Sequence, residues 1–155
     1  MKQLIPMALG LALVTSQAQA ASAYELSDMN DCELAGRMLQ DTTPYLEKAM
    51  SLASSKDYKE VAEWRAKVFN PAMTKIETHY GVYDAATRYQ DKPISREVSS
   101  EFVIRTKLFV QEVYNSVRNN GDKAGMTEQW KMMRVPVEKF SSECEGQSFT
   151  ASGAK

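Results

Sequence analysis

The sequence predicts an all-α protein, an antiparallel up-down-up-down four-helix bundle with proline-kinked helices. Three observations lead to this fold class. Glycine and proline are sparse, with 7 and 5 in 155 residues, so few positions interrupt the chain. Apolar residues recur at helical spacings of three and four over long segments. The turns between these segments are short, which favours antiparallel neighbours over long crossover connections.

The composition fits one globular domain and excludes several functions. Hydrophobic residues make up 43% of the chain and charged residues 25%, which is too apolar for a disordered protein. The formal net charge is -1, so a nucleic-acid binder acting through bulk charge is excluded. No recognised catalytic motif occurs in the chain. We therefore expect a binding protein and not an enzyme.

Residues 1–20 are predicted to be a secretory signal peptide. Lys2 supplies a positive start, an apolar run covers 4–14, and Ala18 and Ala20 stand at the cleavage positions. The run of about eleven residues is shorter than the roughly 20 that a membrane span needs, so we expect no membrane anchor once the signal is removed. A short signal of this kind is typical of bacteria, and the expected location is the periplasm or the exterior. Both compartments are oxidising.

The mature chain divides into a bundle between two tails. Residues 21–30 and 146–155 are expected to be flexible tails, and 31–145 the bundle. The first predicted helix covers 31–53, and Pro44 lies inside it. The apolar line of this helix keeps its register across the proline, so we expect one kinked, continuous helix. That line consists of Cys32, Ala35, Leu39, Thr42, Leu46, Ala49 and Ala53.

A polar turn at 54–57 precedes the second predicted helix, which ends near Tyr89. Its apolar residues are Val61, Trp64, Val68, Ala72, Ile76, Tyr80 and Tyr83. The spacing lengthens to four around Pro71. Because proline removes an amide donor, we expect a kink or a local slip in the helical winding there.

The third predicted helix has Ser95 as its N-cap and stops at 119–122, where polar residues and a glycine follow one another. Its apolar line is Val98, Phe102, Thr106, Phe109, Val113 and Val117, widened by Val103, Val110 and Tyr114. The fourth predicted helix contains Pro136. Its line is Trp130, Met133, Val137, Phe140 and Cys144. Each line is expected to face the centre of the bundle.

Cys32 and Cys144 are predicted to form a disulfide bond. Cys32 lies on the inward line at the start of the first helix, and Cys144 lies on the inward line at the end of the last helix. In an up-down-up-down bundle these two ends meet at one pole, in an oxidising compartment. No Cys-x-x-Cys motif is present, so we expect a structural bond and not a redox pair.

His79 is the single histidine, and it suggests an alternative function. Bundles can hold haem between a histidine and a methionine, and Met38, Met50, Met73 and Met133 lie at or near inward lines. Neither the Cys-x-x-Cys-His motif of covalent haem nor the Glu-x-x-His motif of di-iron bundles occurs. We expect no cofactor and no metal, and a haem- or copper-binding periplasmic carrier is the alternative hypothesis.

Ile104 and Leu108 are the candidate partner-binding residues, because they point about half a turn away from the inward line of the third helix. Scattered exposed aliphatic side chains, or a further packing contact with a tail, are the competing explanations. The sequence thus predicts a small exported helical bundle that binds another protein, in an adaptor, inhibitor, immunity or chaperone-like role. The contact is expected on this outer face or in a groove opened by the prolines. The oligomeric state is left open.

Overall fold

The computed structural model describes residues 26–119 and 121–144. All regular secondary structure in these residues is helical, so the predicted all-α class is confirmed for this part of the chain. The predicted signal peptide (1–20) and the predicted C-terminal tail (146–155) lie outside the described residues. Within the described ranges, no helix combines the length and the apolar character that crossing a membrane requires.

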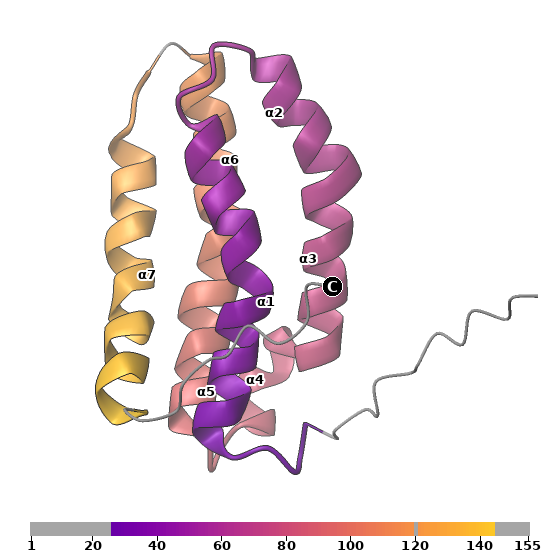
Figure 1. Cartoon of the computed structure of the whole chain (residues 1–155), viewed down its shortest axis with the longest axis vertical. Helices are drawn as coiled ribbons and strands as arrows, with labels where there is room; N and C mark the ends of the chain where they lie inside the picture. Colours follow the sequence, from indigo (N-terminus) through magenta and orange to yellow (C-terminus); the bar gives the residue numbers. More distant parts are fainter. Residues whose placement is uncertain (1–25, 120, 145–155) are drawn as a thin grey trace, which may run out of the picture.

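The long helical segments lie side by side along one axis (Figure 1). Several of them continue directly into one another. In chain order the elements are α1 (Asp31–Leu52), α2 (Tyr58–Trp64), the π-helix η1 (Arg65–Phe69), α3 (Asn70–Tyr80), the 3₁₀-helix η2 (Val82–Asp84), α4 (Ala85–Arg88), α5 (Pro93–Glu97), the π-helix η3 (Val98–Val103), α6 (Ile104–Arg118) and α7 (Ala124–Glu143).

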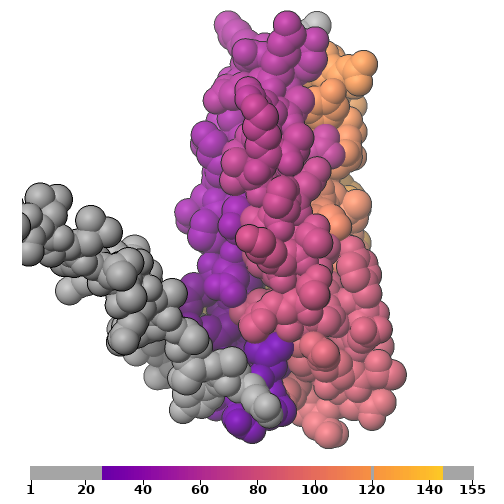
Figure 2. Space-filling model, turned by 90° about the vertical axis from the view of Figure 1, so that its right-hand side faces the viewer, coloured from indigo at the N-terminus to yellow at the C-terminus, as the bar shows by residue number. Residues whose placement is uncertain are grey.

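The elements form an elongated body in which α1 and α6 contact each other and lie between the α2–α3 segment and α7 (Figure 1). α1 packs against α3, α5, η3 and α6, while α2 packs against α6. α7 lies on the other side, mainly against η3 and α6. Figure 2 views the body from the side of α2, η1 and α3, which run down its length between α1 and α6. α7 also contacts α1 directly.

α1 begins with a capping box. Asn30 Oδ1 accepts the Glu33 N–H at 2.9 Å, and Glu33 Oε2 accepts the Asn30 N–H at 3.0 Å. The helix then runs without a break through Pro44 to Leu52, so the prediction of one continuous helix is confirmed. Residues 26–30, expected to be part of a flexible tail, are instead held in place. The Lys92 ammonium donates to the carbonyl oxygens of Leu26, Ser27 and Met29, and the side chains of Leu26 and Met29 pack against the core.

The predicted slip in winding occurs just before Pro71, where η1 is wound as a π-helix. A π-helix bonds residue i to i+5, so the residues after it rotate relative to an unbroken α-helix. As a result Phe69 is 1% exposed, while Val68 is 48% exposed. The predicted placement of Val68 on the inward line is therefore wrong.

The second predicted helix does not reach Tyr89. α3 ends at Tyr80 because Gly81 adopts the left-handed conformation, with φ 58° and ψ 47°, and caps the helix. Tyr89 folds back, is 3% exposed, and donates its hydroxyl to the main-chain oxygen of Tyr80. Tyr83, predicted to face inward, is 70% exposed beyond this turn.

Ser95 is not the N-cap of the third helical segment, because α5 begins at Pro93. Proline suits a first helical position, since its fixed φ is helical and it needs no acceptor for an amide. Asp31 of α1 caps this end from 64 residues away. Its carboxylate accepts the Ile94 N–H at 2.9 Å and the Ser95 N–H at 2.7 Å, and the Ser95 hydroxyl donates to it at 2.6 Å.

The predicted inward lines account for much of the core. Along η3 and α6 the buried residues include Val98, Phe102, Thr106, Phe109 and Val113. The agreement is weaker on α7. Met133, Phe140 and Cys144 are buried, but Trp130 is 39% exposed and Met126 is buried in its place.

Candidate functional site

The disulfide between Cys32 and Cys144 is present, as predicted. Their Cα atoms are 5.7 Å apart, and the bond links positions separated by 112 in the sequence. It ties the first turn of α1 to the residue that follows α7, so the two helices are joined at one end. Neither position leaves a free thiol, and the described residues contain no other cysteine.

Between α1 and α7 the surface is hollowed into an apolar groove, called here the α1–α7 groove. It consists of two adjoining cavities of about 290 Å³ and about 260 Å³ that share Trp130. The first cavity is lined by Leu46, Phe102, Trp130, Met133, Arg134 and Val137. The second is lined by Met50, Ala53, Phe109, Lys123, Met126, Thr127 and Trp130.

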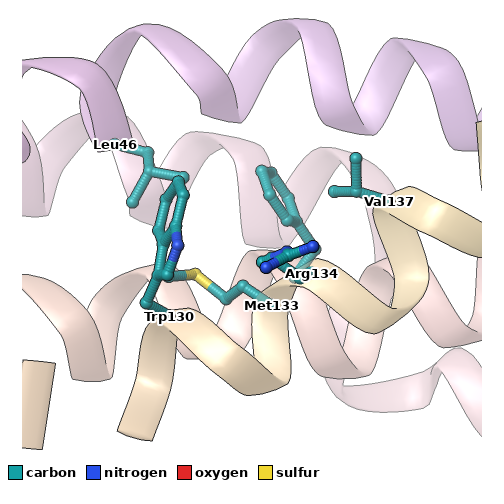
Figure 3. A pocket seen from close by; sticks show the side chains of 6 residues that line it. Leu46, Trp130, Met133, Arg134 and Val137 are labelled. Carbon is teal, nitrogen blue, oxygen red and sulfur yellow. The ribbon is translucent and has the colours of Figure 1, made fainter. Parts of the chain in front are cut away.

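The side chains of the first cavity come from helices far apart in the sequence. In Figure 3 the Trp130 ring extends from α7 beside Leu46, and Arg134 and Val137 follow along α7. Each of the two helices also carries a proline close to this cavity. Pro44 precedes Leu46 by two positions and Pro136 directly precedes Val137. Proline has no amide hydrogen, so it cannot donate the hydrogen bond to the carbonyl oxygen of residue i-4. The backbone at both walls therefore departs from regular α-helical hydrogen bonding.

Trp130 and Met50 form the apolar rim of the groove, and each is 39% exposed. The Trp130 ring packs against the Phe109 ring, with 6.3 Å between the two ring centroids. A large aromatic side chain held over an apolar floor is a common anchor in protein interfaces. The rim is therefore suited to contact with another molecule.

The two charged residues that line the groove, Lys123 and Arg134, are both cations. Arg134 Nη2 donates to Glu138 Oε1 at 2.6 Å, with both side chains more than 60% exposed (63% and 62%). A surface ion pair of this kind contributes little and is readily exchanged for another partner. The groove thus presents apolar surface with positive charge at its edge.

A further cavity of about 450 Å³ lies between α1 and the η1–α3 segment. Its lining includes Asp41, Lys67 and Lys75 beside exposed Val68. Charges of both signs favour water in this cavity over an apolar ligand. It is therefore a weaker candidate site than the α1–α7 groove.

Polar contacts near this face tie the helices together. The Tyr80 hydroxyl donates to Asp41 at 2.6 Å, and burial together with this carboxylate raises the pKa of Tyr80. Lys107 pairs with the buried Glu77 at 2.8 Å. Burial by itself would lower the pKa of Lys107, but the hydrogen bonds to Glu77 and Tyr83 raise it. These groups are engaged in holding α1, α3 and α6 in place.

His79 and the four candidate methionines differ in exposure. His79 is exposed and its ring packs against the edge of Tyr80, with centroids 4.7 Å apart. Met38, Met73 and Met133 are buried in the core, and Met50 lies on the rim of the α1–α7 groove. Across 26–119 and 121–144, no group of three or more His, Cys, Asp or Glu side chains is arranged to hold a metal ion.

The outer face predicted for partner binding is only partly exposed. Leu108 is 45% exposed, but Ile104 is half-buried and packs against the core. The prediction that both point to solvent is wrong for Ile104, since this side chain packs against the core. The sequence did not single out Lys123, Met126 or Arg134. No periodicity marks them, since they form a site only through the approach of α1.

Comparisons with protein-family models, with curated proteins and with solved structures find no match to this chain. The assignment of function therefore rests on the geometry of the site.

Proposed function

We propose that this protein is an exported up-down-up-down four-helix bundle that binds another protein in the α1–α7 groove. The observation that carries the proposal is a pair of adjoining apolar cavities between α1 and α7 that share the half-exposed Trp130. An adaptor, inhibitor, immunity or chaperone-like role is the class of function that such a groove serves.

The bundle architecture is supported by the order and length of the elements. Short connections join the long segments, and the disulfide links the start of α1 to the end of α7. Export to the periplasm or the exterior is supported by the same bond, since disulfides persist in oxidising compartments. The apolar run and cleavage pattern of 1–20 point in the same direction.

Protein binding is supported by the chemistry of the groove. Exposed apolar surface is unfavourable in water. Its removal from water by a partner contributes a favourable free energy of roughly 25 cal/mol per Å². Tryptophan is among the residues whose truncation at an interface costs about 2 kcal/mol or more. Met50 and Trp130 supply such surface on opposite walls of the groove.

The binding test compares variants inside and outside the groove. Met50→Glu places a charge on the rim, and we expect it to abolish retention of the partner from an extract of the secreting cells. Val135→Glu is the matched control, since Val135 is 56% exposed and is not among the residues that line the groove. Leu108→Ser tests the outer face. Retention that survives Met50→Glu but is lost with Leu108→Ser contradicts the groove proposal in favour of the outer face.

Export has a separate test. Protein recovered from the periplasm or the medium should begin at Ala21 and contain no thiol that reacts before reduction. Recovery only from the cytoplasm, with residues 1–20 retained, would contradict this part of the proposal.

A further inference from the structure

The two cavities of the α1–α7 groove repeat at a regular interval. Met126 lines one cavity and Met133 the other, seven positions later on α7. On α1, Leu46 lines one cavity and Ala53 the other, again seven positions apart. With a rise of about 1.5 Å per residue, both walls place the cavities about 10.5 Å apart along the groove.

This interval matches the side chains of a helix and not those of a strand. Side chains seven positions apart in a helix lie on nearly the same face and are separated by about 10.5 Å. On one face of a strand, side chains repeat at about 6.6 Å and about 13 Å, so an extended segment would miss one of the cavities. Trp130 lines both cavities and separates them. An occupant that places one apolar side chain in each cavity must therefore carry small residues between them.

The cations of the groove indicate that its occupant carries negative charge. Lys123 lines the second cavity and Arg134 the first, eleven positions apart on α7. Eleven positions correspond to about 16.5 Å and to nearly the same helical face. A partner helix with carboxylates at a similar spacing would place one acidic side chain at each cation. The Glu138 partner of Arg134 is exposed and can be displaced.

We infer that the occupant of the α1–α7 groove is an acidic amphipathic α-helix of another protein, with two bulky apolar side chains seven residues apart and small residues between them. This inference rests on the proposed function and specifies the partner for the same site. It belongs to the helix-in-groove mode of recognition, in which regularly spaced apolar anchors fill successive pockets.

Synthetic helices test the spacing directly. The first peptide, about 18 residues long, carries two leucines seven positions apart, alanines between them, and glutamates eleven positions apart beside the leucines. The second has the same composition with the leucines five positions apart, which puts them on opposite faces of the helix. Of the 2 tryptophans, Trp64 is replaced by Trp64→Phe, so that the emission of Trp130 alone reports binding.

We expect the seven-spaced peptide to shift the Trp130 emission to shorter wavelength and to bind at least about tenfold more tightly than the five-spaced peptide. Arg134→Glu should weaken its binding, and replacing the facing glutamate of the peptide by lysine should restore it. Val135→Glu should have no effect. Arg134 is 63% exposed, so these changes leave the core intact.

Two results would overturn the inference. Equal binding of both peptides, lost with Met50→Glu, would mean that the groove binds apolar segments without the seven-residue spacing, and the proposed function would stand. A Trp130 shift with dodecanoate but with neither peptide would identify the ligand as an anionic amphiphile. In that case the retention experiment with Met50→Glu and Val135→Glu decides separately whether a protein partner exists.

Discussion

Removing the disulfide should cost the protein a large part of its stability. The bond links positions separated by 112 in the sequence. For a loop of this size the chain-entropy relation gives about 4.8 kcal/mol at 25 °C, because the reduced unfolded chain gains conformational freedom. Domains of this size are stable by about 5–15 kcal/mol in total. Cys32→Ala and Cys144→Ala made together remove the bond without leaving a buried unpaired thiol.

Urea unfolding followed by far-ultraviolet circular dichroism measures the effect. With a denaturant slope of about 1.5 kcal/mol/M, the loss corresponds to a midpoint about 3 M lower in urea. The slope itself should rise, because the unlinked chain exposes more surface when it unfolds. The matched control is reductant, which should lower the midpoint of the wild type to that of the double variant and leave the double variant unchanged.

A double variant whose free energy of unfolding stays within about 0.5 kcal/mol of the wild-type value would contradict the loop-entropy explanation. That result would mean that the ends of α1 and α7 remain close in the unfolded chain, so the bond restricts little that is not already restricted. A reductant effect on the double variant would show that the change in the wild type has another cause.

Three further changes test other parts of the structure. Asp31→Ala should lower the free energy of unfolding by about 1–3 kcal/mol in urea titrations, because the cap donors on α5, including Ser95, lose their acceptor; Asp28→Ala at an exposed position is the control. Tyr80→Phe should reduce the fall in stability above about pH 10, measured by urea midpoints at successive pH values. Burial raises the pKa of Tyr80, so the unfolded chain ionises first and the folded state loses stability as pH rises; an unchanged pH profile would contradict this. Gly81→Ala should cost about 1 kcal/mol, because φ is 58° there, and an equal thermal midpoint would contradict it.

The sequence predicted most accurately where the α-helical period is unbroken. The inward residues of α6 are an example, since Thr106, Phe109 and Val113 are all buried as expected. In the second predicted helix, Val68 was expected to face inward but is exposed. The slip at Pro71 was predicted, but its size decides which of two adjacent residues faces inward, and one residue turns the helix by about 100 degrees.

The ends of the elements were harder to predict than their faces. Ser95 has a side chain suited to an N-cap, but the residue that caps α5 is Asp31, which lies 64 positions away. The second predicted helix stops early at Gly81, whose left-handed conformation ends α3. A glycine is a signal for such an end, yet the apolar period continues past it to Tyr83. The apolar spacing therefore predicted a helix that continues past Gly81, whereas the backbone conformation of Gly81 ends the helix there.

The sequence by itself determined the helical class and the pairing of Cys32 with Cys144, because apolar period and cysteine position are properties of each segment taken alone. The candidate site was decided only by the tertiary structure. Trp130 sits on a predicted inward line but is half-exposed, since α1 and α7 leave a groove beside it. The width of that groove depends on how side chains from distant segments pack between the two helices, and no pattern within one helix encodes that distance.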